Sequence, residues 1–289
     1  MSVVTASVGR RDALVAKATS LALQTFPRDR FEWRVALDGV GDAAATRIEA
    51  DLRAALPNDL ALTVVRTGGV GAGPARDAAA AGARFPVLLL ADDDVTHGSG
   101  ALAAHAAMHG RCSSVVGIGP LRLPDAMRVG GRREPFERAA GWWRQGVERA
   151  HWSNATGTNT SVPREAFEAV GGYDETWFDY GGEDLELALR LRAAGLTFRH
   201  VPEAEAEHHG TVWDDPRKAY RAGRAHVVVA RRHPVAGSAW WLGVHPLLLA
   251  LKRVLLYGPP AWFMDPAVLA YERAYARGAR DARRDGVEP

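Results

Sequence analysis

Short apolar runs alternate with segments of helical periodicity over the first hundred residues. The runs are rich in apolar and β-branched residues, as buried strands are, while the segments between them repeat apolar residues every three or four positions. The runs lie at 3–5, 31–37, 60–65 and 86–90, and the helical segments lie near 14–22, near 48–56 and after 73. This alternation predicts an α/β fold with a mostly parallel sheet flanked by helices.

A polar or glycine-rich segment lies at the end of each of these strands. They are Thr5, Asp38, the glycine turn at 68–73 and the triple aspartate at 92–94. In open parallel sheets, ligands bind outside the carboxyl ends of the strands. We therefore expect a ligand site at this edge of the sheet.

The triple aspartate indicates a bound cation. Adjacent carboxylates repel one another unless a cation or hydrogen-bond donors offset the charge, and hard divalent cations prefer oxygen ligands. A solvated acidic turn is the alternative. His208 and His209 follow a further predicted strand at 197–201. Either histidine is a candidate to share a divalent ion such as manganese with Asp94.

The segment 154–185 places five glycines beside acidic and aromatic residues. Glycine lets backbone or ligand approach closely, so this composition is typical of a pocket wall. The apolar spacing that follows predicts a helix that ends near Gly195, with Glu183 and Asp184 in its first turn. The helix dipole favours an ionised Asp184 there, so this carboxylate is a candidate general base. Ordinary acids at a helix start are the alternative.

The glycine turn has two interpretations. Gly69, Gly71 and Gly73 imitate a dinucleotide-binding fingerprint, which leaves an NAD-dependent oxidoreductase as an alternative. The spacing is GxGxG and not GxGxxG, however, and Pro74 follows directly. We prefer a loop that places Arg76 near a diphosphate.

Aromatic residues cluster in the middle of the chain. Trp142, Trp143 and Trp152 lie beside polar residues, and they form either part of the core or a surface that stacks on a sugar or acceptor. Residues 128–143 are basic and contain glycine, which is typical of a mobile loop or short helix over a site.

The chain becomes strongly apolar after residue 235. His245, Pro246, Lys252 and Arg253 interrupt the apolar stretch before it reaches the roughly 20 residues that a bilayer span needs. Residues 239–256 therefore either pack on the rest of the protein or make peripheral contact with a membrane surface.

Composition narrows the function classes. The chain is 47% hydrophobic and 24% charged, which is ordinary for a globular protein with a sizeable core. Its formal net charge of +2 gives no indication of nucleic-acid binding, and the single cysteine, Cys112, excludes an internal disulfide framework. Because Arg10 and Asp12 interrupt any apolar leader, we expect a cytoplasmic protein, with peripheral attachment to the inner face of the membrane as the variant.

Residues 157–195, GTNTSVPREAFEAVGGYDETWFDYGGEDLELALRLRAAG, resemble the galactosyltransferase-like signature of family 2 glycosyltransferases with the GT-A fold. The similarity extends over roughly residues 3–210. LDG at 37–39 resembles the family's nucleotide-binding aspartate motif, ARD at 75–77 its ARN motif, and DDD at 92–94 its DXD motif.

The resemblance implies an inverting transfer from a nucleotide-sugar, usually UDP-linked, with Mn²⁺ or Mg²⁺ as cofactor. The acceptor would be a hydroxyl of a glycan, a lipid-linked molecule or a small molecule. Carried over to this sequence, the resemblance implies that Thr5 and Asp38 bind the nucleoside and that Arg76 contacts ribose or phosphate. Asp92 and Asp93 would contact the donor, and Asp94 would bind the metal together with His208 or His209. Asp184 would be the catalytic base, and Glu183 would contact the acceptor.

Three departures from the family pattern concern the nucleobase and the metal. LDG has one aspartate where DDG is common, Asp77 replaces the usual asparagine, and the histidine pair leaves the metal ligand open. A sugar-nucleotide or glycan binder without turnover is a competing class. Retention of Asp94, Asp184 and a histidine argues against it, because degeneration would remove at least one of them.

The expected organisation is a GT-A domain over residues 1–234 followed by a helical extension over 235–289. Within the domain we expect a nucleotide-sugar-binding half at 1–110 and an acceptor and catalytic half at 111–234.

Overall fold

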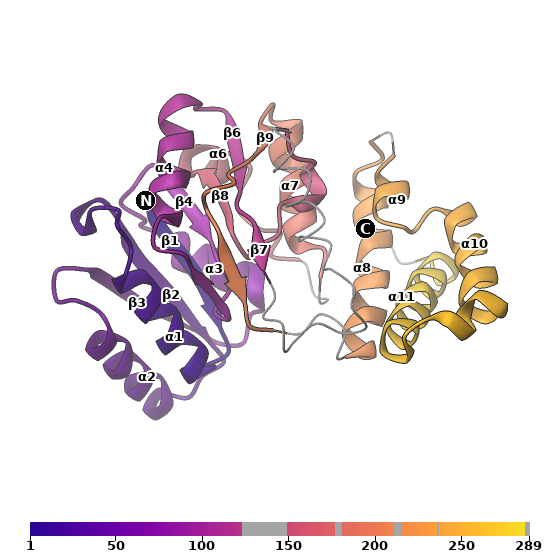
Figure 1. Ribbon diagram of the computed structural model, residues 1–289, viewed down its shortest axis with the longest axis horizontal. Coiled ribbons are helices and arrows are strands. Elements are labelled where there is room, and N and C mark those ends of the chain that lie inside the picture. The colour runs from indigo at the N-terminus through magenta and orange to yellow at the C-terminus, as the bar shows by residue number, and fades with distance from the viewer. Residues whose placement is uncertain (123–148, 177–180, 211–214, 236, 287–289) are drawn as a thin grey trace.

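The computed structural model describes residues 1–122, 149–176, 181–210, 215–235 and 237–286. The proposed loop at 128–143, with Trp142 and Trp143, lies outside these ranges, as do residues 177–180 of the signature segment. Figure 1 shows a sheet-centred body that carries a separate group of helices at its C-terminal side.

A seven-stranded sheet forms the centre of the body. Its order is β3 (Ala61–Thr67), β2 (Glu32–Asp38), β1 (Ser2–Ser7), β4 (Val87–Leu90), β8 (Thr160–Pro163), β6 (Val115–Ile118) and β9 (Thr197–His200). All neighbours pair in parallel except β8, which is antiparallel to both β4 and β6. The structure therefore confirms the α/β class and the mostly parallel sheet.

Helices cover both faces of this sheet (Figure 1). They are α1 (Arg11–Ala22), α2 (Asp42–Ala55), α3 (Ala72–Ala80), α4 (Ala101–Arg111), α6 (Arg164–Ala169) and α7 (Glu183–Ala193), with short 3₁₀ turns η1 (Arg28–Arg30) and η3 (Trp152–Asn154). Successive side chains of β2 point to opposite faces of the sheet, so the strand contributes to two apolar cores. Trp33 and Val35 pack in the core that includes α1 and α2, while Ala36 packs in the core that includes α3 and α7.

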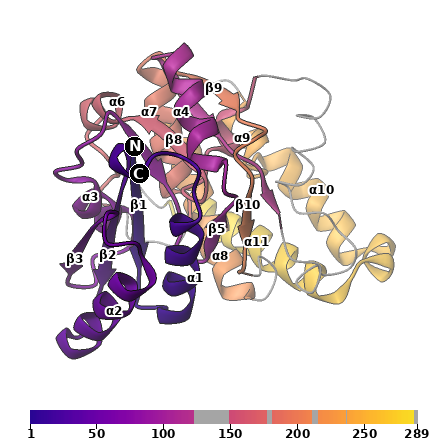
Figure 2. The ribbon, with the colours of Figure 1, turned by 60° about the vertical axis from the view of Figure 1, so that its left-hand side comes forward.

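A second, three-stranded sheet is built from very short strands. The order is β5 (Val95–His97), β10 (Ala206–His208) and β7 (Leu121–Arg122), and β5 and β10 lie side by side in Figure 2. The antiparallel register of β5 and β10 sets His208 opposite Val95. This pairing joins the end of the triple aspartate to the histidine pair.

The C-terminal helices are α8 (Pro216–Arg232), α9 (Ser238–Trp241), α10 (Pro246–Tyr257) and α11 (Pro266–Arg284), with a 3₁₀ turn η4 (Pro259–Phe263). Helices α8 and α11 cross at Gly223 and Gly278, where an added Cβ would overlap the backbone of Tyr275 or Tyr220. Helix α8 precedes the expected boundary at residue 234 and yet packs along α11. The domain division stays a prediction.

A buried polar network lies between α4 and β8. The His105 ring is fully buried, with Nε2 3.1 Å from Asn159 Oδ1 and Nδ1 2.8 Å from Ser161 Oγ. Burial lowers the pKa of His105 from 6.5 to about 4, against the opposing effect of the Asn159 hydrogen bond. Burial also lowers the pKa of His97, His109, His200 and His226.

These neutral histidines are expected to make the protein sensitive to acid. In the unfolded chain they take up protons near pH 6.5, whereas His105 in the folded chain does so only near pH 4, so stability falls as pH drops through this window. The loss of unfolding free energy that His105 causes over this pH window is at most about 3 kcal/mol. Urea unfolding measured between these pH values would show the loss.

Two variants separate this effect from general destabilisation. His105→Gln should flatten the dependence of unfolding free energy on pH, even if it is less stable at neutral pH. Leu14→Ala, which destabilises the core without removing a titratable group, should keep the dependence. A stability that stays constant from pH 6.5 to 4 would contradict the prediction.

Candidate active site

The predicted site residues meet where β4 ends and where α3 and α7 lie against the sheet. Arg76 on α3 is buried, and its Nη2 donates to Asp92 Oδ1 while Nη1 donates to Asp184 Oδ1 at 3.4 Å. Its guanidinium carbon lies 5.6 Å from the centre of the Tyr173 ring. The Arg76 side chain therefore links an aspartate of the triple-aspartate turn to the first turn of α7.

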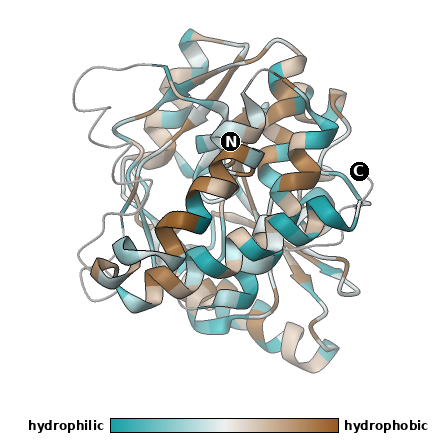
Figure 3. Cartoon of the chain, turned by 90° about the vertical axis from the view of Figure 1, so that its right-hand side faces the viewer, coloured by the Kyte–Doolittle hydropathy of each residue, from teal (hydrophilic) through white to brown (hydrophobic). Residues whose placement is uncertain are grey.

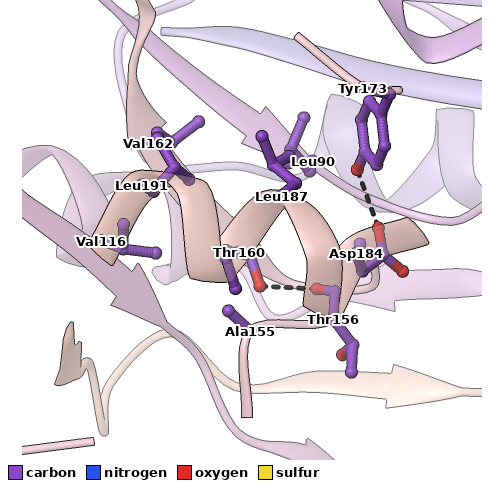
Figure 4. Close-up of a pocket in the computed structure, with 12 residues that line it drawn as sticks. Leu90, Val116, Ala155, Thr156, Thr160, Val162, Tyr173, Asp184, Leu187 and Leu191 are labelled. Carbon is purple, nitrogen blue, oxygen red and sulfur yellow. Dashed lines mark hydrogen bonds between the residues drawn. The ribbon is translucent and has the colours of Figure 1, made fainter. Parts of the chain in front are cut away.

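Asp184 is the second residue of α7, which follows the N-cap Gly182 with its φ of 96°. Tyr173 Oη donates to Asp184 Oδ1 at 2.8 Å, a bond drawn in Figure 4. An added Cβ at Gly157 would come within 2.6 Å of this oxygen and 2.8 Å of the Arg76 guanidinium carbon. The glycine leaves room for the Arg76–Asp184 contact.

Glu183 is the first residue of α7. Burial raises the pKa of Glu183 to about 7, the Asp184 charge adds to this effect, and Arg76 opposes it. Within the described chain its Oε2 is buried and has no hydrogen-bond partner. Glu183 therefore carries a proton part of the time at neutral pH and has an oxygen available to a ligand.

Arg10 and Ser7, which the sequence analysis did not select, hold the second and third aspartates. Asp93 is buried and accepts from Ser7 Oγ at 2.5 Å and from Arg10 Nε at 3.0 Å, and Asp94 Oδ2 accepts from Arg10 Nη1 at 2.7 Å. Both residues lie at or just beyond the end of β1. Their place at the same sheet edge as Asp38 is the signal that could have identified them.

Lys17 was also missed. It lies on α1 and is fully buried, and its Nζ donates to the carbonyl oxygens of Asp92 at 2.9 Å and Val95 at 3.1 Å. Burial lowers the pKa of Lys17 to about 8, while the three aspartates act in the opposite direction. A lysine beside the apolar stripe of Leu14 and Ala18 is a detectable anomaly in the sequence.

The residues around Asp94 fit a divalent metal. Asp94 Oδ1 lies 3.5 Å from His208 Nε2 and, among the described residues, accepts no hydrogen bond although it is buried. A Cβ added at Gly210 would come within 2.9 Å of Asp94 Oδ2 and 3.1 Å of His208 Nε2. A carboxylate and an imidazole thus face a space kept open by glycine, and both are ligands that manganese accepts.

The ring of His209 faces elsewhere. Its Nε2 lies 2.8 Å from Thr96 Oγ1, and its Nδ1 lies 3.6 Å from Glu207 Oε1. In the part of the chain that the structure covers, no group of three or more His, Cys, Asp or Glu side chains is arranged to hold a metal by itself. Substrate or water oxygens would have to complete the coordination that Asp94 and His208 begin.

Asp38 organises the glycine turn. Its carboxylate accepts from Thr67 Oγ1 at 2.7 Å and from the backbone N–H groups of Gly69, Val70 and Gly71 at 2.8–2.9 Å. Burial alone would raise the pKa of Asp38, but these hydrogen bonds lower it below its ordinary value. The nucleoside contact expected of Asp38 stays a prediction.

Thr5 and Asp77 make internal contacts. Thr5 is fully buried and its Oγ1 accepts from Trp33 Nε1 at 3.1 Å, so its nucleoside contact also stays a prediction. The Asp77 carboxyl accepts from the Tyr173 backbone N–H at 3.0 Å, and burial raises its pKa to about 6. Asp77, which replaces the family's asparagine, therefore supports the segment that carries Tyr173.

A pocket lies between α7 and the sheet, with Tyr173 and Asp184 at one end and apolar side chains at the other (Figure 4). Its lining is Leu90, Val116, Ala155, Thr156, Gly157, Thr160, Val162, Tyr173, Asp184, Leu187, Ala188 and Leu191. No Lys or Arg is among these lining residues, so they offer no positive charge to a phosphate. The cationic groups lie instead around the aspartate turn.

Sequence comparisons match the part of the chain that carries Asp184 and His208. Residues 145–211 match a family model described as the N-terminal domain of galactosyltransferase. An N-acetylglucosaminyl-diphospho-decaprenol L-rhamnosyltransferase of Mycobacterium tuberculosis is 36% identical over 114 residues, which cover 38% of this chain and 32% of that protein. A validoxylamine A glucosyltransferase of Streptomyces hygroscopicus is 43% identical over 56 residues, 18% of this chain and 13% of that protein. The matched part spans about a third of the mycobacterial relative.

Solved structures match nearly the whole chain. A mannosyltransferase of Pyrobaculum calidifontis in complex with GDP-Man and Mn²⁺ superposes with a TM-score of 0.72 at 16% identity, over 98% of this chain and 87% of that one. TarS of S. aureus in complex with UDP gives 0.61 at 20% identity, over 99% of this chain and 91% of that one. The chain therefore has the GT-A fold, and residues 145–211 are similar to part of the galactosyltransferase family.

Proposed function

We propose that the protein is an inverting, metal-dependent glycosyltransferase that moves a sugar from a nucleotide-sugar, UDP-linked in our preferred version, to an acceptor hydroxyl. The observation that carries the proposal is the Arg76 guanidinium between Asp92 and Asp184. This guanidinium contacts both the aspartate turn, which would bind the donor, and the candidate base on α7. Such an arrangement suits a reaction in which one bond to the anomeric carbon breaks as another forms.

Asp94 and His208, and not His209, would hold Mn²⁺ or Mg²⁺. The choice rests on the orientation of the two rings, since His208 faces Asp94 whereas His209 lies against Thr96. When bound, the ion would neutralise charge on the leaving nucleoside diphosphate. The Pyrobaculum mannosyltransferase with GDP-Man and Mn²⁺, and GalNAc-T7 with UDP, GalNAc and Mn²⁺, support a metal in this fold.

The chain's own groups supply positioning and proton transfer. Arg76 would hold Asp92 and Asp184 in fixed relation and add positive charge near the leaving diphosphate. Asp184 would take the proton of the acceptor hydroxyl while the hydroxyl oxygen attacks the anomeric carbon. The nucleoside diphosphate would leave from the opposite face of the sugar. Glu183, with its raised pKa and its unpartnered oxygen, would bind an acceptor hydroxyl. A single displacement inverts the configuration.

The acceptor class remains broad. A glycan, a lipid-linked molecule or a small molecule can each present a hydroxyl to Asp184. The name of the mycobacterial relative includes a diphospho-decaprenol, which favours a lipid-linked acceptor here.

The oxidoreductase alternative loses its main support in the structure. Its fingerprint requires backbone N–H groups of the glycine turn to face a pyrophosphate. Three of these groups, from Gly69, Val70 and Gly71, donate to Asp38 instead. The remaining competitor is a sugar-nucleotide or glycan binder that lacks turnover.

Ligand-dependent thermal protection is expected to separate these classes. UDP with Mn²⁺ should raise the melting temperature more than UDP alone, and more than GDP, dTDP or NAD, because Asp94 and His208 would link the ion to the diphosphate. Protection by NAD alone would contradict the proposal. A donor-hydrolysis assay on the same preparation then tells an enzyme from a binder.

A further inference from the structure

The C-terminal helices expose a group of large apolar side chains, here called the docking face. Trp262 and Phe263 on η4 are 82% and 90% exposed, and Leu247 at the start of α10 is 66% exposed. The docking face comprises Trp240, Trp241, Leu247, Leu251, Val254, Leu255, Tyr257, Trp262 and Phe263. Figure 3 views the molecule from the side of these helices, and brown marks their apolar stretches. A concentration of this kind marks an interaction surface.

Helix α10 is apolar on two sides. Leu249 and Leu256 are buried, whereas Leu247, Leu251 and Val254, spaced by four and three residues, point outward. Packing on the protein accounts for the first side only. The second side requires an apolar environment outside the chain.

The charge around the docking face favours an anionic partner. The segment that carries the docking face, residues 238–263, contains no Asp or Glu and two basic residues, Lys252 and Arg253. Lys252 pairs with Glu272 of α11, whereas Arg253 is exposed beside Val254. Tryptophan, aliphatic and basic side chains without acids are typical of segments that bind the interface of an anionic bilayer.

We propose that the docking face lies on the surface of an anionic lipid bilayer. The stretch Ser238–Tyr257 has 20 residues, a mean hydropathy of 1.3 and only 22% burial, so by length and composition alone it could cross a membrane. The chain breaks this stretch, because α9 ends at Trp241 and α10 begins at Pro246. A helix of 12 residues extends about 18 Å, well short of the roughly 30 Å of a hydrocarbon core.

Contacts with α11 also hold α10 against the protein. Lys252 Nζ donates to Glu272 Oε2 at 2.9 Å and lies 4.7 Å from the centre of the Tyr275 ring. The Arg273 guanidinium donates to the Leu256 carbonyl oxygen at 2.8–2.9 Å. A spanning helix would have to break these contacts, whereas a helix lying in the interface keeps them.

The docking face is connected to the candidate active site through α8. Arg232 near the end of α8 forms an ion pair with Asp174, and His233 Nε2 lies 3.0 Å from Glu186 Oε1 on α7. The bilayer would therefore fix the orientation of α7 and present a lipid-linked acceptor to Asp184, a consequence that rests on the proposed function. It would also make the chain a peripheral membrane protein.

Co-sedimentation of the full chain with vesicles tests the docking face without any assay of transfer. We expect binding to vesicles that contain phosphatidylglycerol, and weaker binding in high salt or to pure phosphatidylcholine. Because Trp262 and Phe263 contact little protein, the double variant Trp262→Ser, Phe263→Ser should melt like the wild type. It should lose about tenfold or more in partitioning to anionic vesicles.

The matched control is Leu23→Ser, which removes an exposed apolar side chain (67%) at the end of α1, outside the docking face. Unchanged binding by this variant, together with the loss in the double variant, supports the proposal. Absence of wild-type binding, or undiminished binding by the double variant, overturns it. A concentration-dependent dimer that the double variant abolishes, without vesicle binding, would assign the face to a second copy of the chain and also overturn it.

Discussion

Replacing Asp184 with asparagine is expected to lower turnover by about 10²–10⁴-fold, the usual contribution of general-base catalysis. Asparagine keeps the shape of the side chain and an oxygen that can accept from Tyr173 Oη and Arg76, so the local packing should persist. What it loses is the capacity to take a proton from the acceptor. Donor and metal affinity should change little.

The measurement pairs donor affinity with transfer rate on one preparation of Asp184→Asn. Glu183→Gln is the matched control, because it changes the neighbouring carboxyl and should act mainly through the Michaelis constant for the acceptor. Near-normal turnover in Asp184→Asn would remove this residue as the base. Loss of donor binding would instead assign it a structural role in holding Arg76.

Replacing Asp94 with alanine is expected to abolish metal-dependent binding of UDP. The substitution removes the carboxylate that faces His208 and leaves a single protein ligand at the proposed metal position. His208→Ala should weaken Mn²⁺-dependent UDP binding by at least about tenfold. Isothermal titration with UDP, at matched Mn²⁺ concentrations, gives both values.

His209→Ala is the matched control for the metal position. Its ring contacts Thr96 and Glu207 and not Asp94, so its removal should leave UDP affinity nearly unchanged. UDP binding that is equally tight in excess EDTA would contradict the metal role. An effect of His209→Ala as large as that of His208→Ala would contradict the choice between the two histidines.

Much of the sheet was predictable because its main strands are runs rich in apolar and β-branched residues that end at polar residues or glycine. The runs at 31–37 and 60–65 correspond closely to β2 and β3, whose whole lengths pair in parallel. The three-stranded sheet was not predicted. Strands such as β7, with two residues, show no periodicity, and tertiary pairing alone defines them.

The candidate site was predictable where a residue's position in its element determines its surroundings. Asp92 at a strand end and Asp184 at a helix start both contact Arg76, while the roles expected of these residues stay predictions. The choice between His208 and His209 was not predictable, because neighbouring residues of an extended segment face opposite sides and only the folded structure shows that the side chain of His208 faces Asp94 while that of His209 contacts Thr96.

Arg10 and Lys17 show a second reason for failure. Both are cations that stabilise the aspartate turn from α1 and the loop before it, and their partners lie far away in the sequence. Local patterns carry no information about such long-range pairs. The sequence also left the apolar C-terminal stretch undecided between core and membrane, and the structure gives one side of α10 to the core while leaving the other exposed.

Gly157 and Gly210 bear on how this protein can diverge. Neither has a backbone angle in the left-handed region, so the chain at both positions could accommodate any residue. Only the missing side chain matters, because a methyl group would intrude between Arg76 and Asp184 in one case and between Asp94 and His208 in the other. Replacing either glycine would therefore disturb contacts of the candidate site. We expect relatives that retain the reaction to keep both glycines.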